Sequence, residues 1–198
     1  MKKTSTPLLG WAFNDVLNEL HQLVFEGVPG ESEPFVLTQL EREYIAYTLA
    51  CYYQCNRCLE FHERAVRVAR RKENSPDWNW QDELISATLF LRLDARKLSD
   101  VEWQRWLTAW SDFAKRIDKH HVGLASYLAY AVGIARNDTS LMNHAFASIS
   151  AAIEDNNRLK GVIRDIDGVV VFMKAATSKN RSDSTILNNL QSREIKDV

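Results

Sequence analysis

Apolar residues recur three or four positions apart along most of the chain, the spacing of helices with one buried face. The first pattern covers Leu8–Phe25. The others cover residues 38–51, 55–72, 80–92, a helix beginning at 100, and residues 121–135, 140–154 and 158–176. The only notable β-branched run, Val169–Val171, lies inside a helical pattern, and the chain has only 7 Gly and 4 Pro. These features predict an all-α fold.

Capping sequences and turn residues mark where several of these helices begin. Thr38 with Glu41, and Ser99 with Glu102, have the spacing of a capping box, in which each side chain bonds the other residue's backbone N–H. Residues 137–139 (Asn-Asp-Thr) predict another helix start, and the Gly- and Pro-rich stretch 27–34 predicts a loop.

Length and charge limit the class of protein. A chain of 198 residues with 45 % apolar content is predicted to form one helical domain over residues 1–198. The formal net charge of −1 gives no reason to expect nucleic acid or a membrane surface as a partner. Without a good signal peptide or a membrane-spanning segment, we expect a cytoplasmic protein. Residues 178–198 are polar and predict a mobile tail or an exchanged arm.

The candidate chemistry lies in the stretch Cys55–His62. Cys55, Cys58 and His62 are three and four positions apart and would form one stripe on a helix. Two thiols this close can form and break a disulfide, and an imidazole beside them can move the proton that thiol chemistry needs. Glu43, twelve residues before Cys55, is a possible fourth residue of this site.

Metal, cluster and haem binding are the alternatives to thiol redox chemistry. If Cys51, Cys55, Cys58 and His62 shared one helix, the outer two would lie ~16 Å apart, too far for one tetrahedral metal. The smaller set without Cys51 stays open, but it lacks a visible fourth ligand. The spacing of the three cysteines also matches iron–sulfur enzymes that use adenosylmethionine, whose parallel strands this chain lacks. Covalent haem needs histidine directly after the second cysteine, where Leu59 stands.

The pattern Glu-x₁₁-Cys-x₂-Cys-x₃-His, formed by Glu43, Cys55, Cys58 and His62, resembles the alkylhydroperoxidase D-like family. This family shares its fold with the carboxymuconolactone decarboxylases. The resemblance covers a motif core of about residues 35–92, and all four motif positions match in spacing. It implies an alkylhydroperoxidase D-like helical bundle, with a helix break that lets the Cys55 helix pack antiparallel on the Glu43 helix.

The resemblance also implies a thiol-dependent peroxidase with no cofactor and no metal. Cys58 would attack a hydroperoxide, Cys55 would resolve the sulfenic acid to a disulfide, and His62, held by Glu43, would shuttle the proton. The founding enzymes carry His where this chain has Arg57. A dithiol reductant protein is the expected partner, and a trimer or hexamer the expected assembly. The alternative is a non-enzymatic redox sensor or assembly protein with the same dithiol.

The remaining conspicuous side chains are predicted to be structural. The stripe of Trp103, Trp106 and Trp110 indicates core or subunit packing, and Cys51 a small buried side chain. The other histidines lack ligand spacing and are predicted to lie at the surface or to be satisfied within the fold: His21, His120, His121 and His144.

Overall fold

The computed structural model describes residues 8–27, 35–94 and 97–194, and this part of the chain is helical without a strand. The all-α prediction is therefore confirmed for these residues. The helices are α1 (Leu8–His21), α2 (Gln39–Tyr53), α3 (Asn56–Lys72), α4 (Trp80–Leu91), α5 (Asp100–Asp118), α6 (Leu124–Arg136), α7 (Thr139–Ala152) and α8 (Asn156–Glu194). A π-helical turn, η1 (Gln22–Glu26), follows α1.

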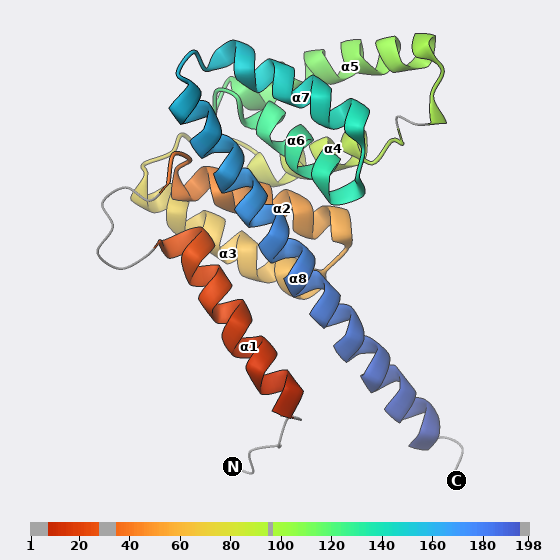
Figure 1. Ribbon diagram of the computed structural model, residues 1–198. Helices are drawn as coiled ribbons and strands as arrows, with labels where there is room; N and C mark the ends of the chain where they lie inside the picture. The colour runs from red at the N-terminus through yellow and green to blue at the C-terminus, as the bar shows by residue number, and fades with distance from the viewer. Residues whose placement is uncertain (1–7, 28–34, 95–96, 195–198) are drawn as a thin grey trace.

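Helix α2 is the centre of the bundle. It packs against α3, α4, α6 and α8, and its residues from Glu43 to Ala50 are all buried. A helix that is buried on every side belongs to a core, so α2 can hold polar groups away from water. Figure 1 shows α8 crossing in front of α2, with α4–α7 above it and with α1 and the end of α8 extending below the body.

The capping predictions are confirmed. Thr38 Oγ1 accepts a hydrogen bond from the Glu41 backbone N–H at 3.2 Å, and Glu41 Oε2 accepts one from the Thr38 N–H at 2.8 Å. Ser99 and Glu102 form the same reciprocal pair at the start of α5. Asp138 caps α7 through its side chain. These caps depend only on residues within one turn, so the sequence is enough to locate them.

The tryptophan stripe packs in the way that its spacing predicts. Trp103 stacks on Trp106 with ring centroids 4.8 Å apart, and Trp106 stacks on Trp110 at 6.1 Å. Trp106 Nε1 also donates to the Phe90 carbonyl at 3.2 Å, which links α5 to α4. The stripe therefore serves packing between helices.

Three helix boundaries differ from the sequence prediction by three or more residues. The first α-helix ends at His21 and continues as the π-turn to Glu26. Helix α6 begins at Leu124 because Gly123, with a φ of 83°, breaks the chain direction before it. Helix α8 runs to Glu194, beyond the predicted end at Ala176, because no Gly or Pro follows Gly168 and each further residue adds one backbone bond.

The greater length of α8 changes the prediction of a mobile polar tail or exchanged arm over residues 178–198. Residues up to 194 continue the helix, and residues 195–198 lie outside the described part of the chain. Exchange of this segment between subunits stays a prediction.

Replacing Gly133 with alanine is expected to destabilise the protein by about 1–3 kcal/mol, the usual cost of overpacking. A Cβ at Gly133 would lie 2.8 Å from Met142 Cγ and 3.1 Å from the Met142 backbone nitrogen, so α6 and α7 would have to separate. Gly168→Ala is the matched control. Its Cβ would meet only Val24 Cγ2, at an ordinary 3.5 Å, and alanine favours the helix by roughly 0.5–1 kcal/mol. Urea denaturation of both variants measures the difference, and equal midpoints would contradict the close packing.

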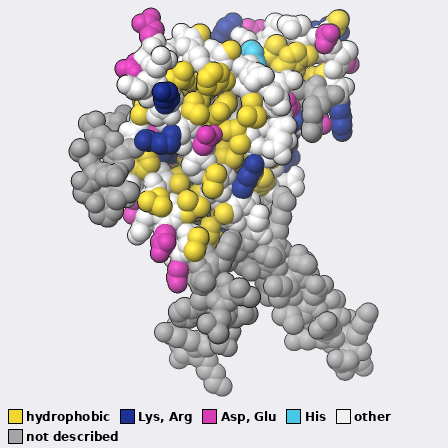
Figure 2. Space-filling view, in the orientation of Figure 1, with side chains coloured by type: hydrophobic (Ala, Val, Ile, Leu, Met, Phe, Trp, Pro, Cys, Tyr) yellow, Lys and Arg dark blue, Asp and Glu magenta, His cyan; other side chains and the backbone are white. Residues whose placement is uncertain are grey.

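No helix in the described ranges is both long and apolar enough to cross a membrane. Figure 2 shows hydrophobic side chains gathered on the face where α7 and α8 lie. A hollow of about 520 Å³ includes Phe146, Leu159 and Ile163 in its lining. Its lining comes from α7 and α8 and not from α2 or α3, so it is separate from the dithiol.

Candidate active site

A left-handed turn separates α2 from α3 directly before the dithiol. Gln54 has a φ of 57°, and its N–H donates to the Cys51 carbonyl at 3.2 Å. The Cys55 N–H donates to the Ala50 carbonyl at 3.1 Å, which completes a Schellman motif. The helix break that the family resemblance implies is therefore present, although glutamine occupies the position where glycine is usual.

Cys55 and Cys58 form a disulfide across the first turn of α3. Their Cα atoms lie 5.2 Å apart, within the range that a disulfide needs. Cys55 is the N-cap of α3, and its Sγ accepts a hydrogen bond from the Cys58 N–H at 3.3 Å. The cysteines are only 9 % and 6 % exposed. Both sulfurs thus lie at the positive end of a helix, where negative charge is stabilised.

Glu43 and His62 form a buried hydrogen-bonded pair between α2 and α3. Glu43 Oε2 lies 2.8 Å from His62 Nδ1, and each side chain is 2 % exposed. In one unbroken helix, Glu43 and Cys55 would be ~18 Å apart along the axis. The antiparallel return of α3 after the turn at Gln54 therefore brings Glu43 to the cysteine helix.

The pairing with Glu43 decides which nitrogen of His62 can act on sulfur. An ionised carboxylate only accepts hydrogen bonds, so we assign the proton to Nδ1. The other ring nitrogen, Nε2, then carries no proton and can accept one. Cys58 lies one helical turn before His62 on the same face of α3. Because Cys58 is bonded to Cys55 and His62 to Glu43, the structure brings the four predicted site residues together.

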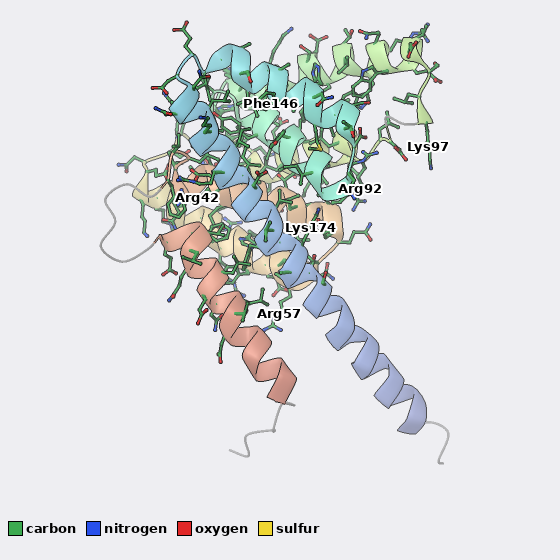
Figure 3. All side chains as sticks on the ribbon, in the orientation of Figure 1. Arg42, Arg57, Arg92, Lys97, Phe146 and Lys174 are labelled. Carbon is green, nitrogen blue, oxygen red and sulfur yellow. A yellow bond between two sulfur atoms is a disulfide. The ribbon has the colours of Figure 1, made fainter. Side chains whose placement is uncertain are left out.

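Arg92 holds the turn before the dithiol, a role that the sequence does not indicate. Its Nη2 donates to the carbonyls of Cys51 and Tyr52, both at 3.0 Å. With the Gln54 amide in its better orientation, Gln54 Oε1 also accepts from Arg92 Nη2, at 3.1 Å. Figure 3 places Arg92 and Arg42 towards opposite ends of α2. Arg92 therefore supplies a donor to the Tyr52 carbonyl and a second donor to the Cys51 carbonyl at the end of the helix.

Arg92→Met is expected to destabilise the protein by about 1–3 kcal/mol, because two carbonyls at the end of α2 lose a charged donor. Arg64→Met is the control: Arg64 is exposed on α3 and has no ion pair among the described residues. Thermal unfolding of the two variants gives the comparison. Equal melting temperatures would mean that Arg92 does not support the turn.

Cys51 lies one turn before the disulfide but in a different environment. Burial raises the pKa of the Cys51 thiol to about 11, while Tyr47, Arg92 and Thr88 lower it less. A thiol with this pKa is almost fully protonated at neutral pH and is a poor nucleophile. Cys51 is half-buried against the core, and not fully buried as the sequence analysis predicted.

An aromatic cluster surrounds His62, and the sequence analysis did not identify it. Phe25, Phe61 and Phe172 have ring centroids 5.6, 5.1 and 6.1 Å from that of His62. His21, predicted to be a surface or satisfied histidine, packs on the same three phenyl rings. The spacing of four between His21 and Phe25 was a weak signal, because it shows a shared helix face but not its distant neighbours.

Arg57 is exposed, and Figure 3 shows it on the side of α3 that faces away from α4–α7. In the described residues, no group of three or more His, Cys, Asp or Glu side chains is arranged to hold a metal ion.

Comparisons with protein-family models, with curated proteins and with solved structures find no match for this chain. The resemblance to the alkylhydroperoxidase D-like family therefore depends on the motif residues and their spacing alone.

Proposed function

We propose that this protein is a thiol-dependent peroxidase that reduces hydroperoxides through the Cys55–Cys58 dithiol. The observation that carries the proposal is the buried hydrogen bond between Glu43 and His62, one turn from a cysteine pair at bonding distance. A structural disulfide needs no such pair. An imidazole with one nitrogen held by a carboxylate is the usual arrangement for moving a proton to or from a nucleophile.

The first step is attack on the peroxide. In the reduced protein, Cys58 gives its proton to His62 Nε2, and the helix N-terminus stabilises the thiolate. The thiolate attacks one peroxide oxygen, the O–O bond breaks, and the departing alkoxide takes the proton from His62. The products are an alcohol and a sulfenic acid on Cys58.

The second step forms the disulfide that the structure contains. The Cys55 thiol attacks the Cys58 sulfur, the S–O bond breaks, and water leaves with the thiol proton. One peroxide and two thiols thus become one alcohol, one water and one disulfide. A dithiol partner then returns both cysteines to thiols by exchange.

Peroxide consumption by the purified protein tests this function. We expect cumene hydroperoxide to be consumed over many turnovers when dithiothreitol is present and for at most one turnover when it is absent. Mass spectrometry should find Cys55 and Cys58 as thiols before peroxide and as a disulfide afterwards. If the disulfide forms reversibly but peroxide is not consumed over many turnovers, the protein is a redox switch and not a peroxidase.

A further inference from the structure

The segment α1–η1 is held over the Glu43–His62 pair by a buried arginine. Arg42, which is almost fully buried, donates from Nη2 to the Phe25 carbonyl at 3.3 Å and from Nη1 to the Leu37 carbonyl. This fixes the π-turn against the start of α2. π-Helical turns are rare and often mark functional sites. Here the turn places the Phe25 ring against the rings of both His21 and His62.

His21 and His62 lie on one aromatic cluster. Phe25, Phe61 and Phe172 have centroids 4.9, 5.5 and 5.6 Å from the His21 ring, and the same three rings surround His62. These side chains come from η1, α3 and α8, so the whole tertiary fold holds the two imidazoles near each other. The ionisable groups that shift the pKa of His21 by their charge are Glu26 on η1, Glu43 on α2 and His62 on α3.

The two ring nitrogens of His21 have different surroundings. Nε2 is buried and has no hydrogen-bond partner among the described residues. Nδ1 lies 3.7 Å from the carboxylate of Glu26, which is 59 % exposed. Burial lowers the pKa of His21, and Glu43 and Glu26 oppose that shift less strongly. A neutral imidazole that reaches from the interior to the surface can accept a proton at one nitrogen and donate one from the other.

Glu43 and His62 have no comparable access to solvent, since each is 2 % exposed. When a reductant thiolate attacks Cys55, the bond to Cys58 breaks, and Cys58 leaves as a thiolate. In the disulfide form His62 keeps only the proton on Nδ1, because its Nε2 proton left with the alcohol. A proton must therefore reach Nε2 from outside before His62 can protonate Cys58. Over the complete exchange the reductant releases two protons and the site takes up two, so a route from solvent is required.

We propose that His21 carries protons between solvent and the buried Glu43–His62 pair. Protons would enter from solvent at Nδ1 beside Glu26 and leave from Nε2 towards His62. The inference rests on the proposed dithiol function but not on peroxide as the oxidant, because any oxidant that forms the disulfide creates the same need for protons.

His21→Phe keeps an aromatic ring in the cluster but removes both nitrogens. His144→Phe is the matched control, because His144 is a half-buried histidine on α7 that packs against Trp103. The disulfide form of each protein is prepared with diamide, and its reduction by dithiothreitol is followed by stopped-flow tryptophan fluorescence in dilute buffer. We expect reduction of His21→Phe to be about tenfold slower than that of the parent, below the usual contribution of a direct acid–base group.

Added imidazole separates proton transfer from a structural effect. It should restore much of the rate in His21→Phe and change the rate of the parent or of His144→Phe little. A parental rate in His21→Phe, or a slow rate that imidazole does not restore, would overturn the role of His21. If the parent does not turn over peroxide but the imidazole effect is present, the peroxidase proposal fails and the role of His21 stands.

Discussion

Cys58→Ser is expected to abolish peroxide turnover and to leave no sulfenic acid that a dimedone probe can trap. Cys58 lies one turn before His62, whose Nε2 can take its proton, and its sulfur lies at the N-terminus of α3. A serine hydroxyl at this position is not an adequate nucleophile towards a peroxide oxygen. The loss should therefore reach the uncatalysed rate.

Cys55→Ser distinguishes the two sulfurs. It should also stop turnover, because no resolving thiol remains, but it should leave a trappable sulfenic acid on Cys58. Cys51→Ser is the control and should turn over like the parent, because burial raises the pKa of Cys51 to about 11 and keeps it a thiol. Peroxide consumption in Cys58→Ser, together with loss of the sulfenic acid in Cys55→Ser, would reverse the assignment.

Glu43→Gln is expected to slow the attack on peroxide by about 100-fold, the low end of the range for positioned proton transfer. The amide has nearly the shape of the carboxylate and can still accept from His62 Nδ1, but it no longer stabilises a charged imidazole ring. Disulfide formation by diamide should slow less, because diamide needs the thiolate but no proton delivered by His62 to a departing oxygen. Stopped-flow oxidation by cumene hydroperoxide and by diamide measures both rates.

The control for Glu43→Gln is Glu63→Gln. Glu63 is on α3, is about one-third exposed, and pairs with Arg67 at 2.8 Å. It is not part of the buried pair, so its replacement should leave both oxidation rates unchanged. If Glu43→Gln oxidises with peroxide as fast as the parent, the buried pair serves stability and not catalysis.

The sequence alone determined those features that depend on neighbours within one or two helical turns. Helix positions follow from apolar periodicity, and the caps at Thr38 and Ser99 follow from side chains three residues apart. The stripe of Cys55, Cys58 and His62 follows in the same way, because the geometry of one helix places such residues on one face. Glu43 was predicted as a partner only through the spacing of the motif.

Tertiary structure decided the features that join distant segments. The turn at Gln54 has no glycine to mark it and is supported by Arg92, about 40 residues away. His21, Phe25 and Phe172 come from opposite ends of the chain, and their meeting around His62 depends on how α1, η1 and α8 pack. Periodicity shows which face of a helix is buried, but it cannot show which distant face covers it. The proposed proton path to solvent therefore depends on the assembled fold.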